Sequence, residues 1–295
     1  FLLHYTEKLW GKTAAELSTE VAGKRLKGLN LKTFILEAIK GKQKKTSHLD
    51  GSFYYPKYGI GAIFEKMQQN LNTESICLGH KVTTIHHKQN KITGVTVNDD
   101  DYFEVQELAC SLPLGVVLNI LNPAPPPEVL QLAKSIQFRD IMLLGFFLDK
   151  ESVNNNGSMY FPSDRYPFTR VYEPRNRSAC MSPKGKTSLM VEIPCQRSEP
   201  IWNQDESALL KEIAQHLIKA NLFREDELLD SCIYRVNNAY PILEKEYLEK
   251  TKPIYGYLSL FQNLHLTGRN GLFAYTHIHD HMVNGRNVVN GLSQK

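Results

Sequence analysis

The residues with the greatest capacity for chemistry lie near the end of the chain, in GRNGLFAYTHIHDHMVNG at positions 268–285. His277, His279 and His281 alternate there, and alternate residues of a strand share a face, so three metal ligands could converge. Ten histidines are an ordinary content for 295 residues, and no C-x-x-C pair accompanies them. We therefore predict no metal site, which leaves a polar surface loop or a junction that holds a cofactor.

The junction interpretation rests on what surrounds Gly268 and Arg269. An apolar strand is expected at 263–268, directly before them, and a helix is expected to begin near Asp280. The backbone N–H groups at a helix start attract an anion or an electron-rich ring. A glycine permits close backbone approach, and an arginine supplies a cation for a diphosphate. A turn with a solvated arginine and a plain helix cap is the alternative.

A second set of residues has the chemistry of a substrate site. Arginine grips a carboxylate or diphosphate through two parallel hydrogen bonds, and tyrosine offers an amphipathic wall. Half-buried aromatic residues and surface arginines are the alternative for any one of them. The candidates are Tyr160, Arg170, Arg235, Tyr240 and Tyr275.

Composition bounds the class of protein. The chain has 295 residues, of which 42% are hydrophobic, so one or two domains with a large core are expected. A formal net charge of +4 is too small to indicate a nucleic-acid partner. The five cysteines are widely scattered, which predicts reduced thiols in a cytoplasmic protein. The longest apolar runs are about as long as a strand, so no transmembrane segment is predicted.

Hydrophobic spacing and turn residues predict the elements that would position these side chains. Helices are expected at 13–28, 30–41, in the stretch after Gly61, from about Pro127, at 205–222 and from Asp280. A meander of strands is expected at 75–78, 81–87, 92–97, 102–105 and 107–111, and a β-rich section at 137–200. Mixed elements of this kind predict an α/β fold.

Several stretches resemble the FAD-dependent amine oxidase and protoporphyrinogen oxidase superfamily. They are YTEKLWG, YPKYGIG, KVTTIHHKQNKITGV, ACSLPL and the 268–285 segment. Their order along the chain is more specific to this superfamily than any one of the stretches alone. In detail, stretches such as MYFPSDRYPFTRV resemble the UDP-galactopyranose mutase-like members. The resemblance implies FAD as cofactor, contacted by Gly59, Gly61, Val82, Gly268, Arg269, Asp280, His281 and Met282.

The resemblance also implies a domain plan. Residues 53–122 and 263–295 would form an FAD-binding, Rossmann-like domain, and residues 123–262 an α+β substrate domain to which residues 1–52 add helices. The family's G-x-G-x-x-G motif is missing, because Gly59 and Gly61 have no third glycine. With the abrupt apolar start at Phe1, this leads us to expect that an N-terminal Rossmann segment is absent. The chain alone would then bind FAD weakly or not at all.

Three functions remain open at this stage. The first is hydride transfer from a small organic substrate to the flavin, and no catalytic residue is singled out for it. The second is a mutase that isomerises a nucleotide sugar without net redox change. Ala274 argues against the mutase, since relatives of that kind carry an arginine at this place. The third is an inactive fragment or binding module.

Overall fold

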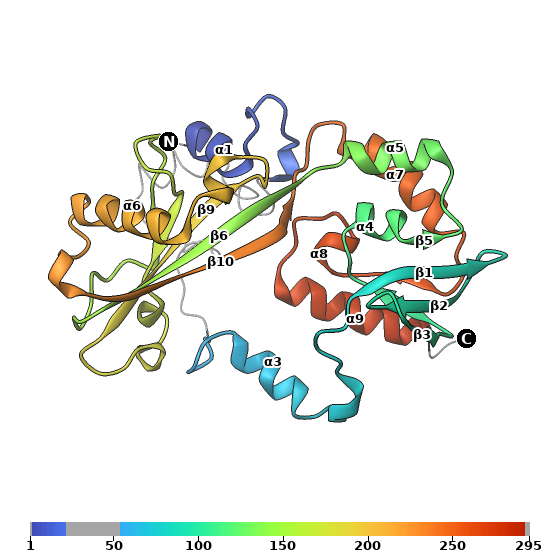
Figure 1. Cartoon of the computed structure of the whole chain (residues 1–295), viewed down its shortest axis with the longest axis horizontal. Helices are drawn as coiled ribbons and strands as arrows, with labels where there is room; N and C mark the ends of the chain where they lie inside the picture. Colours follow the sequence, from blue (N-terminus) through green and yellow to red (C-terminus); the bar gives the residue numbers. More distant parts are fainter. Residues whose placement is uncertain (1, 22–53, 293–295) are drawn as a thin grey trace, which may run out of the picture.

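The computed structural model describes residues 2–21 and 54–292 (Figure 1). Strands and helices are mixed, as the α/β prediction requires, and they gather around two main hydrophobic cores. Strands β6 (Phe138–Leu148) and β10 (Leu228–Pro241) run side by side as an antiparallel pair and connect the two groups of elements. Among the described helices, none is both long and apolar enough to cross a membrane.

The first group contains a sheet with the strand order β3-β2-β1-β5. Strands β1 (Val82–Lys88), β2 (Lys91–Val97) and β3 (Asp101–Glu104) form the predicted antiparallel meander, and β5 (Leu121–Asn122) pairs in parallel with β1. The turn between β1 and β2 uses Gln89 and Asn90, both at positive φ, which suits a tight hairpin. The strand predicted at 75–78 is wrong. A 3-10 turn, η2 (Thr73–Ser75), precedes exposed irregular chain there.

The fourth strand of the predicted meander, β4 (Leu108–Cys110), leaves this sheet. It pairs in parallel with β11 (Leu264–Leu266), more than 150 residues further along the chain. Asn263 fixes the junction, because its buried amide accepts from the Ile92 N–H and donates to the Ile92 and Gln106 carbonyls. The prediction that the meander packs against residues 263–268 is therefore confirmed.

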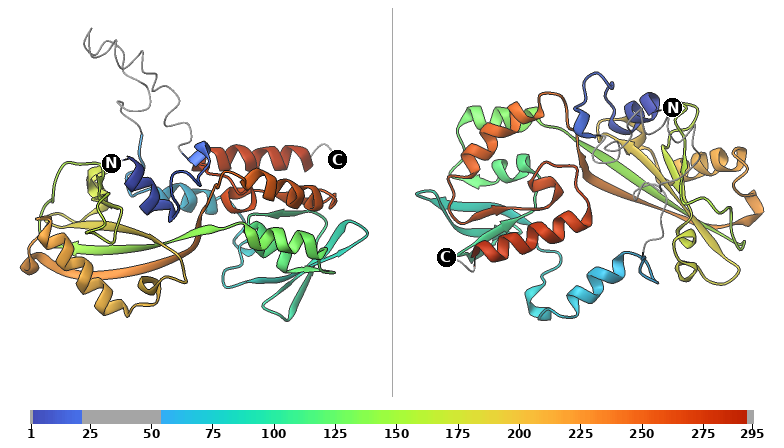
Figure 2. Two further views of the ribbon diagram at one scale, coloured as in Figure 1. Left: turned by 90° about the horizontal axis from the view of Figure 1, so that it is seen from above. Right: turned by 180° about the vertical axis from the view of Figure 1, so that it is seen from behind.

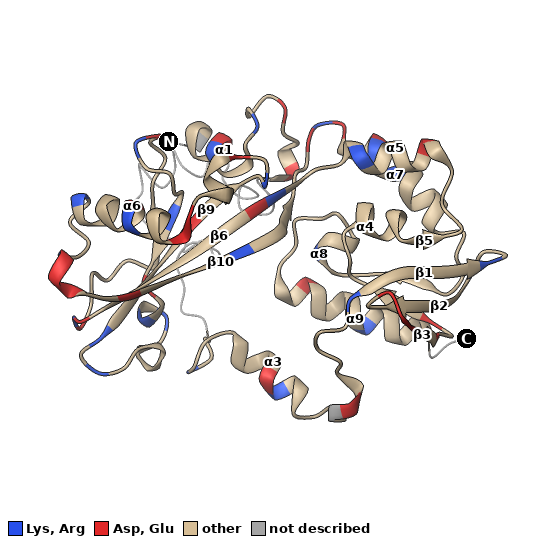
Figure 3. Ribbon diagram, in the orientation of Figure 1, with Lys and Arg blue, Asp and Glu red and all other residues tan. Residues whose placement is uncertain are grey.

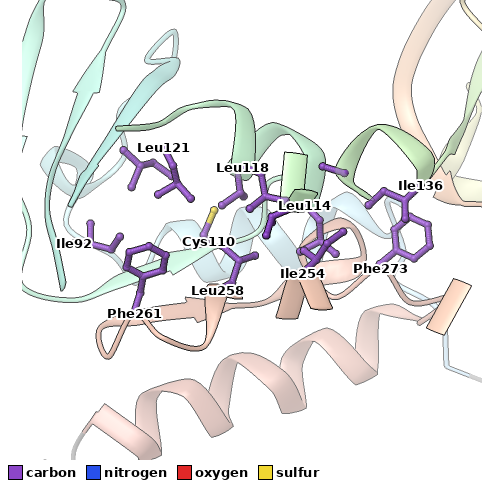
Figure 4. Close-up of a cluster of buried hydrophobic side chains, with 14 of the residues drawn as sticks. Ile92, Cys110, Leu114, Leu118, Leu121, Ile136, Ile254, Leu258, Phe261 and Phe273 are labelled. Atoms are coloured by element: carbon purple, nitrogen blue, oxygen red, sulfur yellow. The ribbon is translucent and has the colours of Figure 1, made fainter. Parts of the chain in front are cut away.

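Three helices close the core of this first group (Figure 4). They are α4 (Leu114–Asn119), α5 (Pro127–Ser135) and α7 (Tyr247–Leu258). Leu114, Leu118, Ile254 and Phe273 are buried together, and each such side chain contributes about 1.5–3 kcal/mol when removed from water. By packing, α5 and α7 belong to this core, although the sequence-based division placed residues 123–262 in a substrate domain. The domain boundaries stay a prediction.

The second group is a five-stranded antiparallel sheet with the order β10-β6-β9-β8-β7. Its shorter members are β7 (Met159–Tyr160), β8 (Arg170–Tyr172) and β9 (Thr187–Cys195). Helix α6 (Glu206–Lys219) is capped by Asp205, which accepts from the Ala208 N–H at 2.9 Å. Its buried face packs on alternate residues of β6, among them Met142, Leu144 and Phe146.

Helix α1 (Leu2–Trp10) lies across the opposite face of this sheet from α6 (Figure 2). The Lys8 ammonium donates to three backbone carbonyls, those of Phe161, Ser163 and Phe168, at 2.8–2.9 Å. Arg139 on β6 donates to the Leu9 carbonyl near the end of the helix. These contacts fix α1, which the sequence patterns did not predict, against the sheet.

The helix predicted at 13–28 does not form over its described part. Thr13 and Glu16 do bond as a capping pair, at 2.6 Å between hydroxyl and carboxylate, but they close a turn. Leu17 then forms a β-bridge with Glu244, and its side chain is buried beside Trp10. Pairing with a distant segment thus overrides local helix propensity. Residues 22–28 and the helix predicted at 30–41 lie outside the described residues.

The remaining helices are α3 (Gly61–Gln68), α8 (Gly268–Gly271) and α9 (Ile278–Leu292), with four short 3-10 turns. Those turns are η3 (Pro174–Asn176), η4 (Ala179–Met181), η5 (Pro200–Asn203) and η6 (Glu225–Glu227). Helix α3 buries none of its own side chains in the described structure. Basic and acidic residues occur on both groups of elements, in keeping with the small net charge (Figure 3).

Candidate functional site

A pocket of about 380 Å³ lies between the five-stranded sheet, helix α1 and the segment around α8. This volume suits a small organic molecule. The pocket combines two guanidinium groups, one carboxylate and several aromatic rings, supplied by both groups of elements. Its lining consists of Tyr5, Leu9, Trp10, Tyr160, Arg170, Glu192, Tyr240, Arg269, Tyr275 and His277.

The floor of the pocket is set by strand register. Tyr160 on β7 pairs with Arg170 on β8, and Arg170 pairs with Glu192 on β9. Directly opposed residues in antiparallel strands point to the same face of a sheet. A phenol, a guanidinium and a carboxylate therefore form one row on the face opposite α6, although they lie far apart in sequence.

Arg170 and Glu192 form a bidentate pair. The Arg170 Nε donates to Glu192 Oε2 at 2.9 Å, and its Nη2 donates to the other carboxylate oxygen. Burial works to lower the pKa of Arg170, but the hydrogen bonds and charge of Glu192 outweigh it, so the net pKa is raised. Glu192 is thus committed to Arg170, and the pair presents little net charge to the pocket.

Trp10, Tyr240 and Tyr275 form an aromatic wall. The Trp10 ring lies edge-on to both tyrosines, with ring centroids 6.0 Å and 5.5 Å away. The Arg269 guanidinium stands over both tyrosine rings, at 5.2 Å from Tyr240 and 5.5 Å from Tyr275. Cation–π stacking of this kind orients an arginine without neutralising its charge.

Arg269 differs from Arg170 in its partners. It donates to the Thr276 carbonyl at 2.6 Å and to the Ala239 carbonyl at 3.4 Å. Over residues 2–21 and 54–292, no carboxylate lies within ion-pair distance of it. The positive charge of the pocket is therefore concentrated at Arg269, next to the aromatic wall.

The half-buried phenols of Tyr5 and Tyr240 hold their protons. Burial raises the pKa of Tyr5 to about 12, and nearby Arg170 only partly offsets this. Burial also raises the pKa of Tyr240, assisted by the negative charge of Glu192. At neutral pH both groups are hydrogen-bond donors rather than bases.

Arg235 is the one substrate candidate that the structure places elsewhere. On β10, Arg235 pairs with Met142 of β6, whose side chain packs under α6. The Arg235 side chain therefore points to the face of the sheet that α6 covers. There it forms an ion pair with Glu206 and donates to the Trp202 carbonyl at 3.1 Å. Tyr160, Arg170, Tyr240 and Tyr275 meet in the pocket, and Arg235 does not.

The profile of the family described as flavin containing amine oxidoreductase matches residues 23–276, most of the chain. The chain belongs to the flavin-containing amine oxidoreductase family. This confirms the resemblance drawn from the sequence, and FAD is the cofactor that the family implies. No curated protein sequence shows a significant match.

Solved structures of three enzymes share the fold. A reduced UDP-galactopyranose mutase is similar over 93% of this chain, with a TM-score of 0.75 and 20% identity. A candidate protoporphyrinogen oxidase from Exiguobacterium sp. 255-15 covers 72% of this chain (TM-score 0.58, 12% identity, 46% of that chain). Putrescine oxidase bound to putrescine covers 80% (TM-score 0.54, 14% identity, 53% of that chain). The chain spans 59% of the length of the mutase.

The residues that the resemblance assigns to the flavin lie in three parts of this family member. Gly268, Arg269, Asp280, His281 and Met282 lie on α8 and within the first five residues of α9. Gly59, Gly61 and Val82 lie outside the pocket, the glycines before and at the start of α3 and the valine at the start of β1. Their contact with a flavin stays a prediction.

Gly268 has a structural task within its own segment. Its φ is +71°, and a Cβ there would stand 3.0 Å from the Ser111 Cβ. A Cβ on Gly271 would approach the Cys110 carbonyl oxygen to 2.9 Å. Glycine at both positions therefore lets α8 lie against the end of β4.

Asp280 lies near the start of its helix, as the sequence predicted, but it is the third helical residue and not the N-cap. Helix α9 begins at Ile278, and the Asp280 carboxylate reaches back to accept from the His277 N–H at 2.9 Å. This is the acidic half of a capping box, in which the third helical residue satisfies the residue before the helix. The helix start is therefore stabilised by Asp280 from within the first turn.

Two buried polar atoms of this segment lack a partner among the described residues. They are the Oδ1 of Asn270 and the Nδ1 of His281. His281 touches Thr276 through its other ring nitrogen, at 3.3 Å. Burial and the nearby charge of Arg269 lower the pKa of His281 and favour its neutral form. Within the described ranges, no three His, Cys, Asp or Glu side chains are arranged to hold a metal ion.

Sequence reasoning assigned no place in a pocket to five lining residues: Tyr5, Leu9, Trp10, Glu192 and His277. The YTEKLWG stretch had been matched to the family, yet no side chain in it was assigned a role. Its Tyr5 and Trp10 could have been singled out only as the aromatic residues of a stretch matched to the family, because five residues do not place them on one helix face. Glu192 carried no local signal, since only strand pairing brings it to Arg170.

Proposed function

We propose that the protein is an FAD-dependent oxidoreductase that removes a hydride from a small organic molecule held in the pocket. One observation carries this proposal. Arg269 and Tyr275, which belong to the segment that the resemblance places at the flavin, line the same pocket as Tyr160, Arg170 and Tyr240. A pocket that shares a wall with the cofactor segment is the arrangement that hydride transfer needs.

The residues of the cofactor segment fit a flavin. The start of α9 supplies backbone N–H groups, and Asn270 and His281 supply the partnerless polar atoms. We expect this segment to hold the flavin ring by hydrogen bonds. A bound flavin supplies the hydride acceptor, and the protein supplies position and electrostatics.

The charges of the pocket favour a substrate with an anionic group. Glu192 is already paired with Arg170, so it does not offer an amine substrate a free carboxylate. Arg269, which the sequence assigned to the flavin diphosphate, lines this pocket and has no carboxylate partner in the described part of the chain. We therefore assign it to a carboxylate or phosphate of the substrate instead. The aromatic wall would cover the apolar part of such a molecule and exclude water.

The mutase reaction is the second candidate, and Arg269 favours this reaction as well. A nucleotide sugar carries a diphosphate that Arg269 and Arg170 could contact, and the mutase structure shares the fold at a TM-score of 0.75. Ala274 weighs against it, because an alanine cannot pair with a phosphate. We therefore place the oxidoreductase first.

The test uses the protein expressed from its complete reading frame. The bound flavin is followed by its visible absorbance under anaerobic conditions while carboxylates, phosphate esters, amines and neutral alcohols are added in turn. We expect bleaching by a member of the anionic group. Arg269→Met should weaken that substrate about tenfold to a hundredfold, as expected for a lost charge-assisted bond, and Arg269→Lys should recover part of the loss.

Arg235→Met is the matched control, because it removes an arginine from the other face of the same sheet. It should leave the bleaching unchanged. Bleaching only by amines, or an equal loss in both variants, would contradict the proposed substrate class. Conversion of UDP-galactopyranose to its furanose form by the reduced protein would promote the mutase, and a protein without flavin would favour a binding module.

A further inference from the structure

Strand β10 is irregular where it enters the pocket. Val236 pairs with Ile141 and Tyr240 pairs with Arg139, so three residues of β10 stand opposite the single residue Asp140 of β6. Asn238, in the middle of this bulge, has a φ of +52°, an uncommon value for a residue with a side chain. The bulge determines the direction in which Tyr240 leaves the strand.

The Asp140 carboxylate fills the space opposite this bulge. It is nearly buried, with its side chain 4% exposed. One oxygen accepts from the Asn238 N–H at 2.7 Å, and the other accepts from the Arg197 N–H at 3.1 Å. The Arg197 Nε lies 3.4 Å away and balances the charge. A carboxylate that satisfies two backbone donors holds both chain segments in place.

The bulge in turn supports the pocket arginine. The carbonyl of Ala239, next to Asn238, accepts from Arg269 Nη1 at 3.4 Å. The ring of Tyr240, one residue further, lies under the same guanidinium and against Trp10. A shift of the bulge would therefore move two of the contacts that orient Arg269.

We propose that Asp140 is a positioning residue of the pocket, whose carboxylate fixes the β10 bulge so that Ala239 and Tyr240 present Arg269 to the ligand. Asp140 does not line the pocket itself. The inference rests on the proposed function, because it assumes that Arg269 receives an anionic group.

The experiment measures anion binding without turnover. Trp10 and Trp202 are the two tryptophans of the chain. In a Trp202→Phe background, Trp10 alone reports on the pocket wall, and inorganic pyrophosphate serves as the anionic probe. We expect Asp140→Ala to weaken the binding of pyrophosphate about tenfold, which is close to the effect of losing one hydrogen bond to a charged group. Asp140→Asn, which keeps an acceptor for the Asn238 N–H, should weaken it less.

Glu173→Gln is the matched control. Glu173 is also a buried carboxylate that accepts from two backbone N–H groups, those of Val153 and Asn154, but it has no contact with β10. The Glu173→Gln variant should unfold at a lower midpoint temperature and bind pyrophosphate with unchanged affinity. If Asp140→Ala binds the probe as well as the parent, or if Glu173→Gln weakens binding as much as Asp140→Ala does, the proposal is overturned.

A parent protein with no affinity for pyrophosphate would overturn it as well, because Arg269 would then not be presented to the pocket. Failure of the proposed function shows itself separately, as flavin that no substrate bleaches. The two results can therefore be told apart.

Discussion

The bidentate pair at the floor of the pocket gives the sharpest stability prediction. Glu192→Gln removes the negative charge and leaves one acceptor oxygen for the Arg170 guanidinium. The Glu192 side chain is 9% exposed and that of Arg170 is 29% exposed. The substitution therefore leaves the mostly buried Arg170 cation with one of its two hydrogen-bond acceptors and without a counter-charge.

The magnitude follows from the burial. Removing one partner of a fully buried ion pair costs about 3–5 kcal/mol. Water still reaches part of Arg170, and the Tyr172 ring lies 5.3 Å from its guanidinium, so the loss should be smaller. We expect Glu192→Gln to lower the free energy of unfolding by about 2–3 kcal/mol.

The assay is urea unfolding in the Trp202→Phe background, followed by the fluorescence of Trp10, which lines the same pocket. Asp149→Asn is the control, because the Lys186–Asp149 pair is exposed on both sides and should contribute about 1 kcal/mol or less. Replacing both Arg170 and Glu192 by methionine should recover part of the loss, since no buried charge remains unpaired. If Glu192→Gln costs no more than Asp149→Asn, the pair is not a buried one and this reasoning fails.

Three further predictions follow from local geometry. Gly271→Ala should cost about 1–3 kcal/mol, because its Cβ would meet the backbone at Cys110, whereas Gly256→Ala in α7 has open space and should be neutral or stabilising. Asp205→Ala should cost about 1 kcal/mol in urea unfolding as a lost cap of α6, and no loss would rule out the cap. The raised pKa of Tyr5, about 12, favours the neutral phenol in the fold, so stability should fall as pH rises from 10.0 toward 12. Tyr5→Phe should reduce that fall, and an unchanged pH dependence would contradict the assignment.

Local patterns predicted most of the regular elements. The meander, α5, α6 and β6 lie within a few residues of where alternation, turn residues and capping signals put them. The error at 13–21 arose because Leu17 gains more by burial beside Trp10 than a short helix gains from propensity. The amide of Asn263, which joins β2 to the β4–β11 pair, also had no local signal, since its partners are distant in sequence.

The site was predictable only in part, for the same reason. Arg170, Tyr240 and Tyr275 carry chemistry that can be read residue by residue, and they do meet in the pocket. Arg235 had the same chemistry, but the alternation along β10 sends it to the other face. Neither the bulge opposite Asp140 nor the pairing of Glu192 can be read without the strand register, so sequence alone could not complete the site.

The most direct test of the account is a crystal structure of the complete protein with FAD bound. We predict that the flavin ring lies against the start of α9, between Tyr275 and His281, and faces the pocket that Arg269 lines. The partnerless Asn270 and His281 atoms should then have found partners. A flavin bound away from this segment, with the Arg269 pocket closed off from its ring, would contradict the central claim.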